Sequence, residues 1–462
     1  MNPLLFSLRG LLAIFLLFPV CLPAQPDEWE DLLSVFSEDS ARKMLAARYG
    51  QAAIPAPDPV AVKALIDQHP NQWVRWPVYG FEVKKIEQAS LINAEIRRFS
   101  PDGSYLFMPK NKTLRIYDGK TGQYLKKIDL PPETSSEVVR WHHKLNILYV
   151  THKNQIIGHD IKNNRSFQVN YTGPEIGWVS KAGWRAPAGG DANDISAKGY
   201  YLLTHGKYKS ACVVRFDESD PAILHIVTKK PWDLPEGTDY ATVNVNSTGI
   251  VVIGQKNSGI PILLYDFEGN KIETLYGSRG HTEQFWYWDA GKKKPAFIVK
   301  YNPDRARFHK GNTGDKVIIH YDYQDGKAQI EHQPLIKWNI PGQRLHPQNA
   351  NAQYSYAGYD SKSLILALNP PKFPDMYHAY IGEILEGSLD SSDPTVRRVM
   401  HNLCSRSSPV HLQAEAGANH DGSLIWVKTD MGGLLKMRDQ YILLVRIPPR
   451  TTPSKRKRLL SQ

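Results

Sequence analysis

The sequence predicts an all-β fold, a seven-bladed β-propeller with a short helical leader at its N-terminus. Seven strand-like runs each end in a small turn that is followed by a second apolar run. The turns are Asp102-Gly103, Lys144-Leu145, Lys198-Gly199, Thr248-Gly249, Ala290-Gly291, Asp360-Ser361 and Asp421-Gly422. A repeat of about 40–50 residues with four short strands is typical of a propeller blade, and the longer intervals are interpreted as loop insertions.

The N-terminus predicts a secretory signal peptide over residues 1–24. Arg9 precedes the apolar run LLAIFLLFPV, and the small residue Ala24 ends the segment. The run is shorter than the ~20 apolar residues of a membrane span, so no transmembrane segment is expected. Lipid anchoring at Cys21 is the alternative, but its signal needs a small residue before the cysteine, and Val20 is not small. We therefore expect a secreted or periplasmic protein.

The chain is basic, with a formal net charge of +11. Signal cleavage removes Arg9 and no acid, which leaves +10 on the mature chain. A basic exported protein favours an acidic partner such as a polyuronate or a sulfated glycan. We expect an acidic polysaccharide and no nucleic acid, and the oligomeric state stays open. A basic tail over residues 450–462 is interpreted as a solvated end.

The sequence divides into three parts after the signal peptide. Residues 25–72 form a helical leader and a Pro-rich linker, in which Trp29 lies on an apolar helical face and Ser37 can cap the next helix. Residues 73–449 form the propeller. A strand from residues 73–90 is expected to pair with the last blade and so close the ring.

Short sequence motifs do not indicate a particular enzymatic activity. Cys212 and Cys404 are the cysteines left after cleavage, and one disulfide between them is left open. The sequence has no P-loop, no GxSxG elbow and no CxxC pair.

The patterns FSPDGSYL and LRIYDGKTG resemble those of WD40-like and TolB-like bacterial propellers. Segments 280–283, 380–401 and 413–432 resemble secreted propellers that include polysaccharide lyases. The oligogalacturonate-lyase type implies a Gln-x-x-His-x-His metal segment. This chain has Gln413, but alanines (Ala416 and Ala418) occupy the two histidine positions. A divalent metal ion is therefore left open as a cofactor.

The candidate site is a ring of polar side chains at one mouth of the central channel. The inner strand of each blade starts near this mouth, so residues about five to nine positions before each turn should converge there. Those chosen as substrate-binding candidates are Asn193, Glu283, Gln353, Gln413 and Glu415. The alternative is that these side chains are polar because a channel mouth is wet.

The segment HTEQFWYW, residues 281–288, is the richest in candidate groups. It places His281 beside four aromatic rings, of which Trp286 and Trp288 are expected to stack on sugars. Since strand residues alternate between two faces, only two of the four rings can face one side, and the other two are expected in the core.

Two functions of different classes remain. The first is a lyase that cleaves uronate linkages by β-elimination, which needs a cation for the carboxylate, a base and an acid. The cation is Arg140 or Arg185, the base is His281 or His143, and the acid is Tyr200, Tyr240 or Tyr287. The second is a non-catalytic glycan- or protein-binding propeller of the cell envelope.

Overall fold

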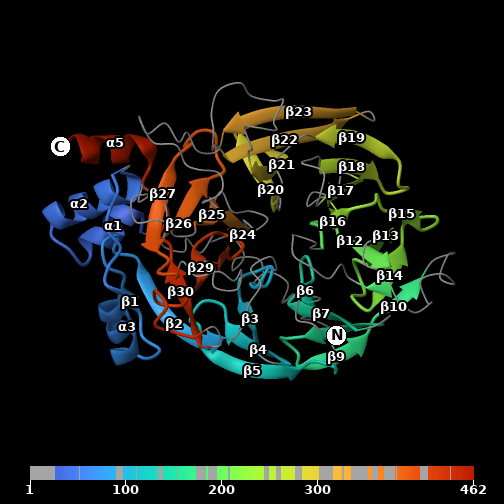
Figure 1. The fold of residues 1–462 in the computed structure, drawn as a ribbon, viewed down its shortest axis with the longest axis horizontal. Helices are drawn as coiled ribbons and strands as arrows, with labels where there is room; N and C mark the ends of the chain where they lie inside the picture. Colours follow the sequence, from blue (N-terminus) through green and yellow to red (C-terminus); the bar gives the residue numbers. More distant parts are fainter. Residues whose placement is uncertain are drawn as a thin grey trace, which may run out of the picture.

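The computed structural model shows a mostly β protein, whose described residues form four helices and several mainly antiparallel sheets (Figure 1). It describes residues 26–462 except 51, 90–96, 111, 133, 135–138, 153–154, 173–183, 186–194, 206–208, 244–248, 256–261, 276–282, 301–315, 325–326, 335–351, 356–362, 369–379, 381, 406–414 and 437–438. Within these residues the strands form seven sheets, numbered 1 to 7 below.

The first three sheets follow one another along the chain. Sheet 1 contains β3 (Tyr105–Lys110), β4 (Thr113–Asp118) and β5 (Tyr124–Asp129). Sheet 2 contains β6 (Val139–Trp141), β7 (Ile147–His152), β8 (Gln155–Asp160) and β9 (Arg165–Gln168). Sheet 3 contains β10 (Asn170–Thr172), β11 (Trp184–Arg185), β12 (Tyr200–His205), β13 (Ser210–Phe216), β14 (Ile223–Ile226) and β15 (Trp232–Asp233).

The next three sheets have four strands each. Sheet 4 contains β16 (Thr238–Val243), β17 (Ile250–Gln255), β18 (Ile262–Asp266) and β19 (Lys271–Leu275). Sheet 5 contains β20 (Glu283–Asp289), β21 (Lys292–Lys300), β22 (Lys316–Gln324) and β23 (Lys327–Pro334). Sheet 6 contains β24 (Ala352–Ser355), β25 (Ser363–Leu368), β26 (Glu383–Ser388) and β27 (Val396–His401).

Sheet 7 joins the two ends of the chain. It contains β1 (Val74–Arg75) and β2 (Glu82–Ala89) from the start, and β28 (Glu415–Ala418), β29 (Leu424–Thr429) and β30 (Gln440–Arg446) from the end. β2 pairs antiparallel with β30, with Val83 opposite Val445, which is the pairing predicted for residues 73–90. The pairing covers an edge of β30 that would otherwise expose unpaired backbone groups.

Neighbouring sheets pack face to face through apolar clusters. Sheet 7 packs on sheet 1, where Trp426 and Leu444 meet Leu106 and Tyr117. Similar clusters join sheet 1 to sheet 2, sheet 2 to sheet 3, sheet 3 to sheet 4, and sheet 6 to sheet 7. Sheet 5 meets sheet 6 through its backbone, since the Trp288 amide donates to the Leu389 carbonyl at 2.8 Å. Figure 1 shows the sheets following one another around a common centre.

The turns of sheets 7 and 1 meet at Gly103. This glycine has φ +72°, and a Cβ there would lie 2.9 Å from Nδ1 of His420, so only glycine permits this approach. Gly199 of sheet 3 lies against His143 of sheet 2 in the same way, with a Cβ-to-Cε1 distance of 2.9 Å. The contact between the last and first sheets therefore has the geometry of a contact between consecutive sheets.

Gly103→Ala is expected to cost about 2 kcal/mol of unfolding free energy, because it adds a clash with His420 to the strain of a positive φ. Gly237→Ala is the matched control: Gly237 has φ +78°, but a Cβ there meets no described atom within 4 Å, so about 1 kcal/mol is expected. Urea denaturation of both variants measures the difference. Equal losses would contradict the close contact between sheets 7 and 1.

The N-terminal helices are α1 (Glu28–Leu33), α2 (Glu38–Tyr49) and α3 (Pro59–Gln68). Ser37 caps α2 as predicted, since its hydroxyl accepts a hydrogen bond from the Ser40 amide. Trp29 and Leu32 are buried against α2, whereas Leu33, whose exposed fraction is 41%, faces solvent. Figure 1 shows these helices on the outside of sheets 6 and 7.

The interpretation of residues 450–462 as a solvated basic end was wrong. Residues Pro453–Ser461 form helix α5, which packs on α2, with Leu459 buried against Leu45. Arg456 is buried and its Nη2 lies 2.5 Å from Oδ1 of Asp393. Because Asp393 lies 63 residues before Arg456, the charge run itself gave no sign of this partner.

A buried charge cluster fastens both chain ends to sheet 6. We call it the terminal charge cluster, and it comprises Glu28, Glu386, Asp393, Arg397, Arg450 and Arg456. Nη1 of Arg397 lies 3.2 Å from Oε2 of Glu28, and Nε lies 2.5 Å from Oε2 of Glu386. Burial alone would raise the pKa of Glu386, but the charges of Arg397 and Arg450 lower this pKa to about 2.

The two cysteines do not form the disulfide that the sequence left open. Both thiols are free and buried. Cys212 packs in the cluster between sheets 2 and 3, and Cys404 packs in the cluster between sheets 6 and 7. Burial raises the pKa of both thiols, so neither is set up as a reactive thiolate.

Candidate functional site

Part of the predicted channel-mouth site cannot be compared with the structure. His281, Asn193 and Gln413 lie outside the described residues. The backbone alone is described for four further candidates, Arg185 in β11, Tyr240 in β16, Glu283 in β20 and Gln353 in β24. Their convergence on one mouth stays a prediction.

Glu415 lies at the start of inner strand β28, where the sequence placed it, but it is buried. Its Oε1 lies 2.9 Å from Nζ of Lys428, directly opposite on β29, and both side chains are at most 4% exposed. Burying two charged groups costs desolvation free energy, and the attraction between the two charges offsets this cost. Glu415 therefore neutralises a buried lysine and is not presented to a ligand.

Arg140 and His143 are also buried. Nη1 of Arg140 donates to the carbonyl of its neighbour Val139 at 2.8 Å. The His143 ring stacks on His142 with centroids 4.2 Å apart, and its exposed fraction is 5%. Burial, with the nearby charges of Lys144 and Arg97, lowers the pKa of His143 to about 4. So low a pKa makes the imidazole a weak base, and burial keeps it from a polymeric substrate.

The four rings of the segment 281–288 divide as alternation predicts for the residues described. Tyr287 is buried, with an exposed fraction of 2%, while Trp286 and Trp288 lie together on the half-exposed face of β20. The ammonium group of Lys293 covers both indoles, at 4.7 Å from the Trp286 centroid and 5.5 Å from the Trp288 centroid. These faces therefore already hold a cation, which competes with sugar stacking.

The described residues show no group of three His, Cys, Asp or Glu side chains that could hold a metal ion. His401 and Cys404 are both buried, and Nε2 of His401 contacts the carbonyl of Ile54 at 3.1 Å. No helix in the described part of the chain is long and apolar enough to span a membrane.

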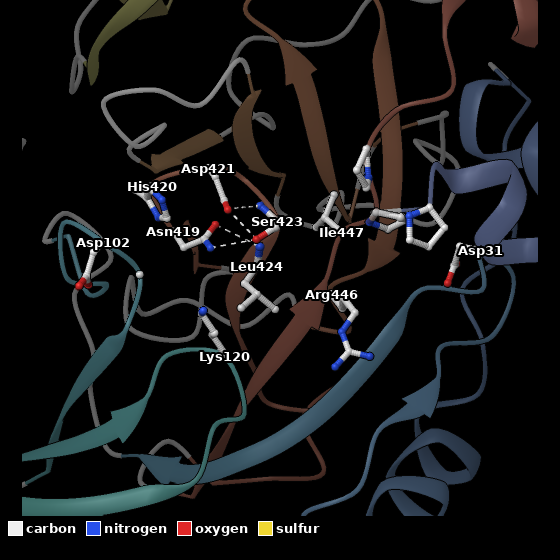
Figure 2. Close-up of a pocket in the computed structure, with 14 residues that line it drawn as sticks. Asp31, Asp102, Lys120, Asn419, His420, Asp421, Ser423, Leu424, Arg446 and Ile447 are labelled. Carbon is white, nitrogen blue, oxygen red and sulfur yellow. Dashed lines mark hydrogen bonds between the residues drawn. The ribbon is translucent and has the colours of Figure 1, made fainter. Parts of the chain in front are cut away.

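The described residues instead line a pocket of about 440 Å³ at the opposite ends of the inner strands, which we call the turn pocket (Figure 2). Its residues come from the leader, two turns of sheet 1, the first turn of sheet 7 and the exit from β30. They are Pro26, Asp31, Asp102, Gly103, Lys120, Asn419, His420, Asp421, Ser423, Leu424, Arg446, Ile447, Pro448 and Pro449. The pocket exists because the first and last sheets are neighbours.

A second pocket of about 530 Å³ adjoins the turn pocket. We call the two pockets together the turn groove. The two share Asp421, Ser423, Ile447, Pro448 and Pro449. The Pro448 carbonyl accepts a hydrogen bond from Arg397, and the Pro449 carbonyl accepts one from the Glu28 amide. These contacts hold the segment between the two pockets in place, so the groove has a fixed floor.

Two carboxylates of the turn pocket, Asp102 and Asp421, accept hydrogen bonds within their own turns. Asp102 accepts hydrogen bonds from the Ser100 hydroxyl, the Ser104 amide and Nδ2 of Asn146. Asp421 accepts from the amide and the hydroxyl of Ser423. Burial alone would raise the pKa of both acids, but these hydrogen bonds lower it. Both therefore stay ionised at neutral pH, which suits binding and excludes them as general acids.

Two turns of this pocket were recognisable in the sequence, but their meeting in one cavity was not. The Asp-Gly pairs at 102–103 and 421–422 were recognised as turns, and Asp421 lies next to the predicted mouth segment. The mouth was expected at the other end of the strands. No local pattern indicated that Lys120 and the prolines after β30 would share a cavity with those turns.

The fold defines the class of protein: a mostly β protein of packed antiparallel sheets. Comparison with known proteins finds similarity of shape but not of sequence. No protein-family model and no curated protein sequence matches the chain. The β-propeller domain of Cps50 (Swd1) from Myceliophteria thermophila is similar at TM-score 0.44 and 10% identity, over 78% of this chain and 98% of that one.

Two further solved structures are similar to the same extent. Hydrazine synthase from Kuenenia stuttgartiensis has TM-score 0.42 and 13% identity, over 78% of this chain and 97% of that one. U3-55K has TM-score 0.43 and 11% identity, over 79% of this chain and 98% of that one. Similarities with TM-scores below 0.5 carry no information about the function of this chain.

Proposed function

We propose that this chain is an exported seven-bladed β-propeller that binds an acidic polysaccharide without cleaving it. The seven sheets, the pairing of β2 with β30 and the packing of sheet 7 on sheet 1 support the closed ring. The signal-like N-terminus supports export, and the net charge of +10 after cleavage supports an acidic partner.

One contrast carries the choice of binding over catalysis. Three of the candidate catalytic side chains that the structure describes, Arg140, His143 and Tyr287, are each at most 6% exposed. The turn groove, by comparison, is open and lined by polar side chains on hydrogen-bonded turns. A pre-formed polar cavity of several hundred Å³ is suited to binding a sugar, whereas the buried candidates for catalysis are not presented to one.

The experiment combines calorimetry with absorbance near 235 nm, on polygalacturonate, alginate and a neutral galactan. We expect binding to the two polyuronates that weakens with salt and no growth of absorbance, since only β-elimination creates the conjugated double bond. Contacts between exposed charges lose reach as the Debye length falls from ~10 Å at 0.1 M to ~3 Å at 1 M. Absorbance that grows in proportion to protein would instead support the lyase, and equal binding to the neutral galactan would refute the preference for acids.

A further inference from the structure

The polar groups of the turn pocket are of two kinds. Committed groups already make hydrogen bonds or ion pairs within the protein, and uncommitted groups can still bind a ligand. Asp31 is committed, since its Oδ2 lies 2.9 Å from Nη1 of Arg75. Asp102 accepts three hydrogen bonds, as described above. Asn419 is committed at both ends of its amide, to the Ser423 hydroxyl and the Leu424 backbone. These groups hold the walls in shape and have little left to offer a ligand.

Lys120 is uncommitted. Its ammonium makes no hydrogen bond or ion pair with any described residue, although its charge helps to lower the pKa of the nearby Asp118. The side chain is exposed at the turn between β4 and β5. Arg446, the other cation of the lining, is paired with Glu82 and stacks over Trp73 at 4.2 Å. Figure 2 shows the Arg446 guanidinium directed away from the turn that carries Asp421. Lys120 is thus the cation available to a negatively charged group in the pocket.

Asp421 and His420 supply hydrogen-bonding capacity on the other wall. The amide and the hydroxyl of Ser423 both donate to Oδ1 of Asp421, so the carboxylate keeps acceptor capacity at Oδ2 for a ligand. His420 makes no hydrogen bond within the described part of the chain, and its Nδ1 is covered by the Gly103 turn. Figure 2 shows these two residues on one side of the pocket and Lys120 on the other.

We propose that the turn pocket binds a uronate residue of the acidic polysaccharide, with its carboxylate on Lys120 and its hydroxyls on Asp421 and His420. Leu424, Ile447 and Pro448 provide apolar lining for the sugar ring. The inference rests on the proposed function and adds the site and the ligand chemistry. An ammonium and a carboxylate facing each other across one cavity match a ligand that carries both a negative charge and hydroxyl donors.

This arrangement discriminates against two other ligand classes. A neutral sugar lacks the carboxylate and leaves Lys120 without a partner. A polyanion without hydroxyls cannot donate to Asp421, and its charge is repelled by that carboxylate. The pocket is therefore expected to prefer uronates to both.

The test is calorimetric titration of the full mature chain with trigalacturonate, the mannuronate trimer and neutral galactotriose. Lys120→Gln is expected to weaken binding of the preferred uronate about tenfold, and Lys120→Glu to abolish it. Lys127→Gln is the matched control, because Lys127 is an exposed lysine of the same sheet, on β5, outside the pocket, and pairs with Asp129. Binding by this variant should be unchanged.

The outcomes separate this site from the general function. If the protein binds a uronate trimer and both Lys120 variants bind it equally well, the site proposal fails and the binding function stands. If galactotriose binds as tightly as the uronates, the role of Lys120 as the carboxylate partner fails. If none of the three sugars binds, both proposals fail.

Discussion

Arg397→Met is expected to destabilise the protein by about 3–5 kcal/mol, the loss that follows when one partner of a buried ion pair is removed. Arg397 is 1% exposed and bridges Glu28 of α1 and Glu386 of β26. Removing the guanidinium takes the closest cation from two buried carboxylates. The cations that stay are farther away, since Arg48 lies 3.6 Å from Glu28 and Arg450 lies 3.5 Å from Glu386. Urea denaturation at neutral pH measures the change in the free energy of unfolding.

The control is an ion pair in solvent. Lys43→Met removes the partner of Asp39 on α2, where both side chains are 76% exposed, and should cost less than about 1 kcal/mol. A second variant isolates the charge: adding Glu386→Gln to Arg397→Met removes a carboxylate that has lost its closest cation and should recover part of the loss. A loss for Arg397→Met as small as that of the control would show that the terminal charge cluster does not fasten the chain ends.

Local signals explain which parts of the fold were predictable. Gly103 and Gly422 follow aspartates and have φ of +72° and +75°, so the Asp-Gly pairs did mark turns that need glycine. The pairing of residues 82–89 with β30 followed from a general requirement, since the last sheet would otherwise expose an unpaired edge. The turns were predictable from neighbouring residues, and the strand pairing from the general tendency of β-sheets to avoid exposed edges.

The sequence did not show which charges are paired and buried. Arg397 and Arg398 belonged to a segment chosen for its resemblance to lyases. Arg398 pairs with Glu383 of that segment, whereas Arg397 also binds Glu28, 369 residues away. His143 was chosen as a base because it is a histidine near a blade turn, and its burial against sheet 3 depends on how sheets 2 and 3 pack. The turn pocket likewise needs five separate segments of the chain, which meet only where sheet 7 packs on sheet 1.

The stacked pair His142 and His143 is expected to make the protein acid-labile. Burial, with the neighbouring charge of His143, lowers the pKa of His142 to about 3, and burial, with the charge of Lys144, lowers that of His143 to about 4. Arg97 and Arg215 add positive charge nearby, and Glu218 opposes them weakly. Both rings therefore stay neutral in the folded protein at pH values where they would be charged in the unfolded chain.

The sign of the pH dependence follows from proton uptake. In the unfolded chain a histidine titrates near pH 6.5, so between pH 6.5 and 4 the unfolded state binds protons that the folded state does not. The stabilisation from the neutral pair is complete above about pH 6.5 and is lost as the pH falls toward 4. With folded-state pKa values of about 3 and about 4, the pair should account for about 6 kcal/mol of lost stability between pH 7 and pH 4, about half from each ring.

Urea denaturation at several pH values between 7 and 4 measures this slope, and His143→Leu tests its origin. Neither ring nitrogen of His143 has a hydrogen-bond partner in the described part of the chain, so leucine removes a titrating group and no hydrogen bond. The variant should lose about half of the extra acid sensitivity. His69→Leu, an exposed histidine after α3, is the control and should keep the wild-type slope. Carboxylates such as Asp421 also titrate in acid, but they are present in wild type and in both variants, so their contribution to the slope cancels in the comparison. Parallel slopes for wild type and His143→Leu would therefore refute the role of the histidine pair.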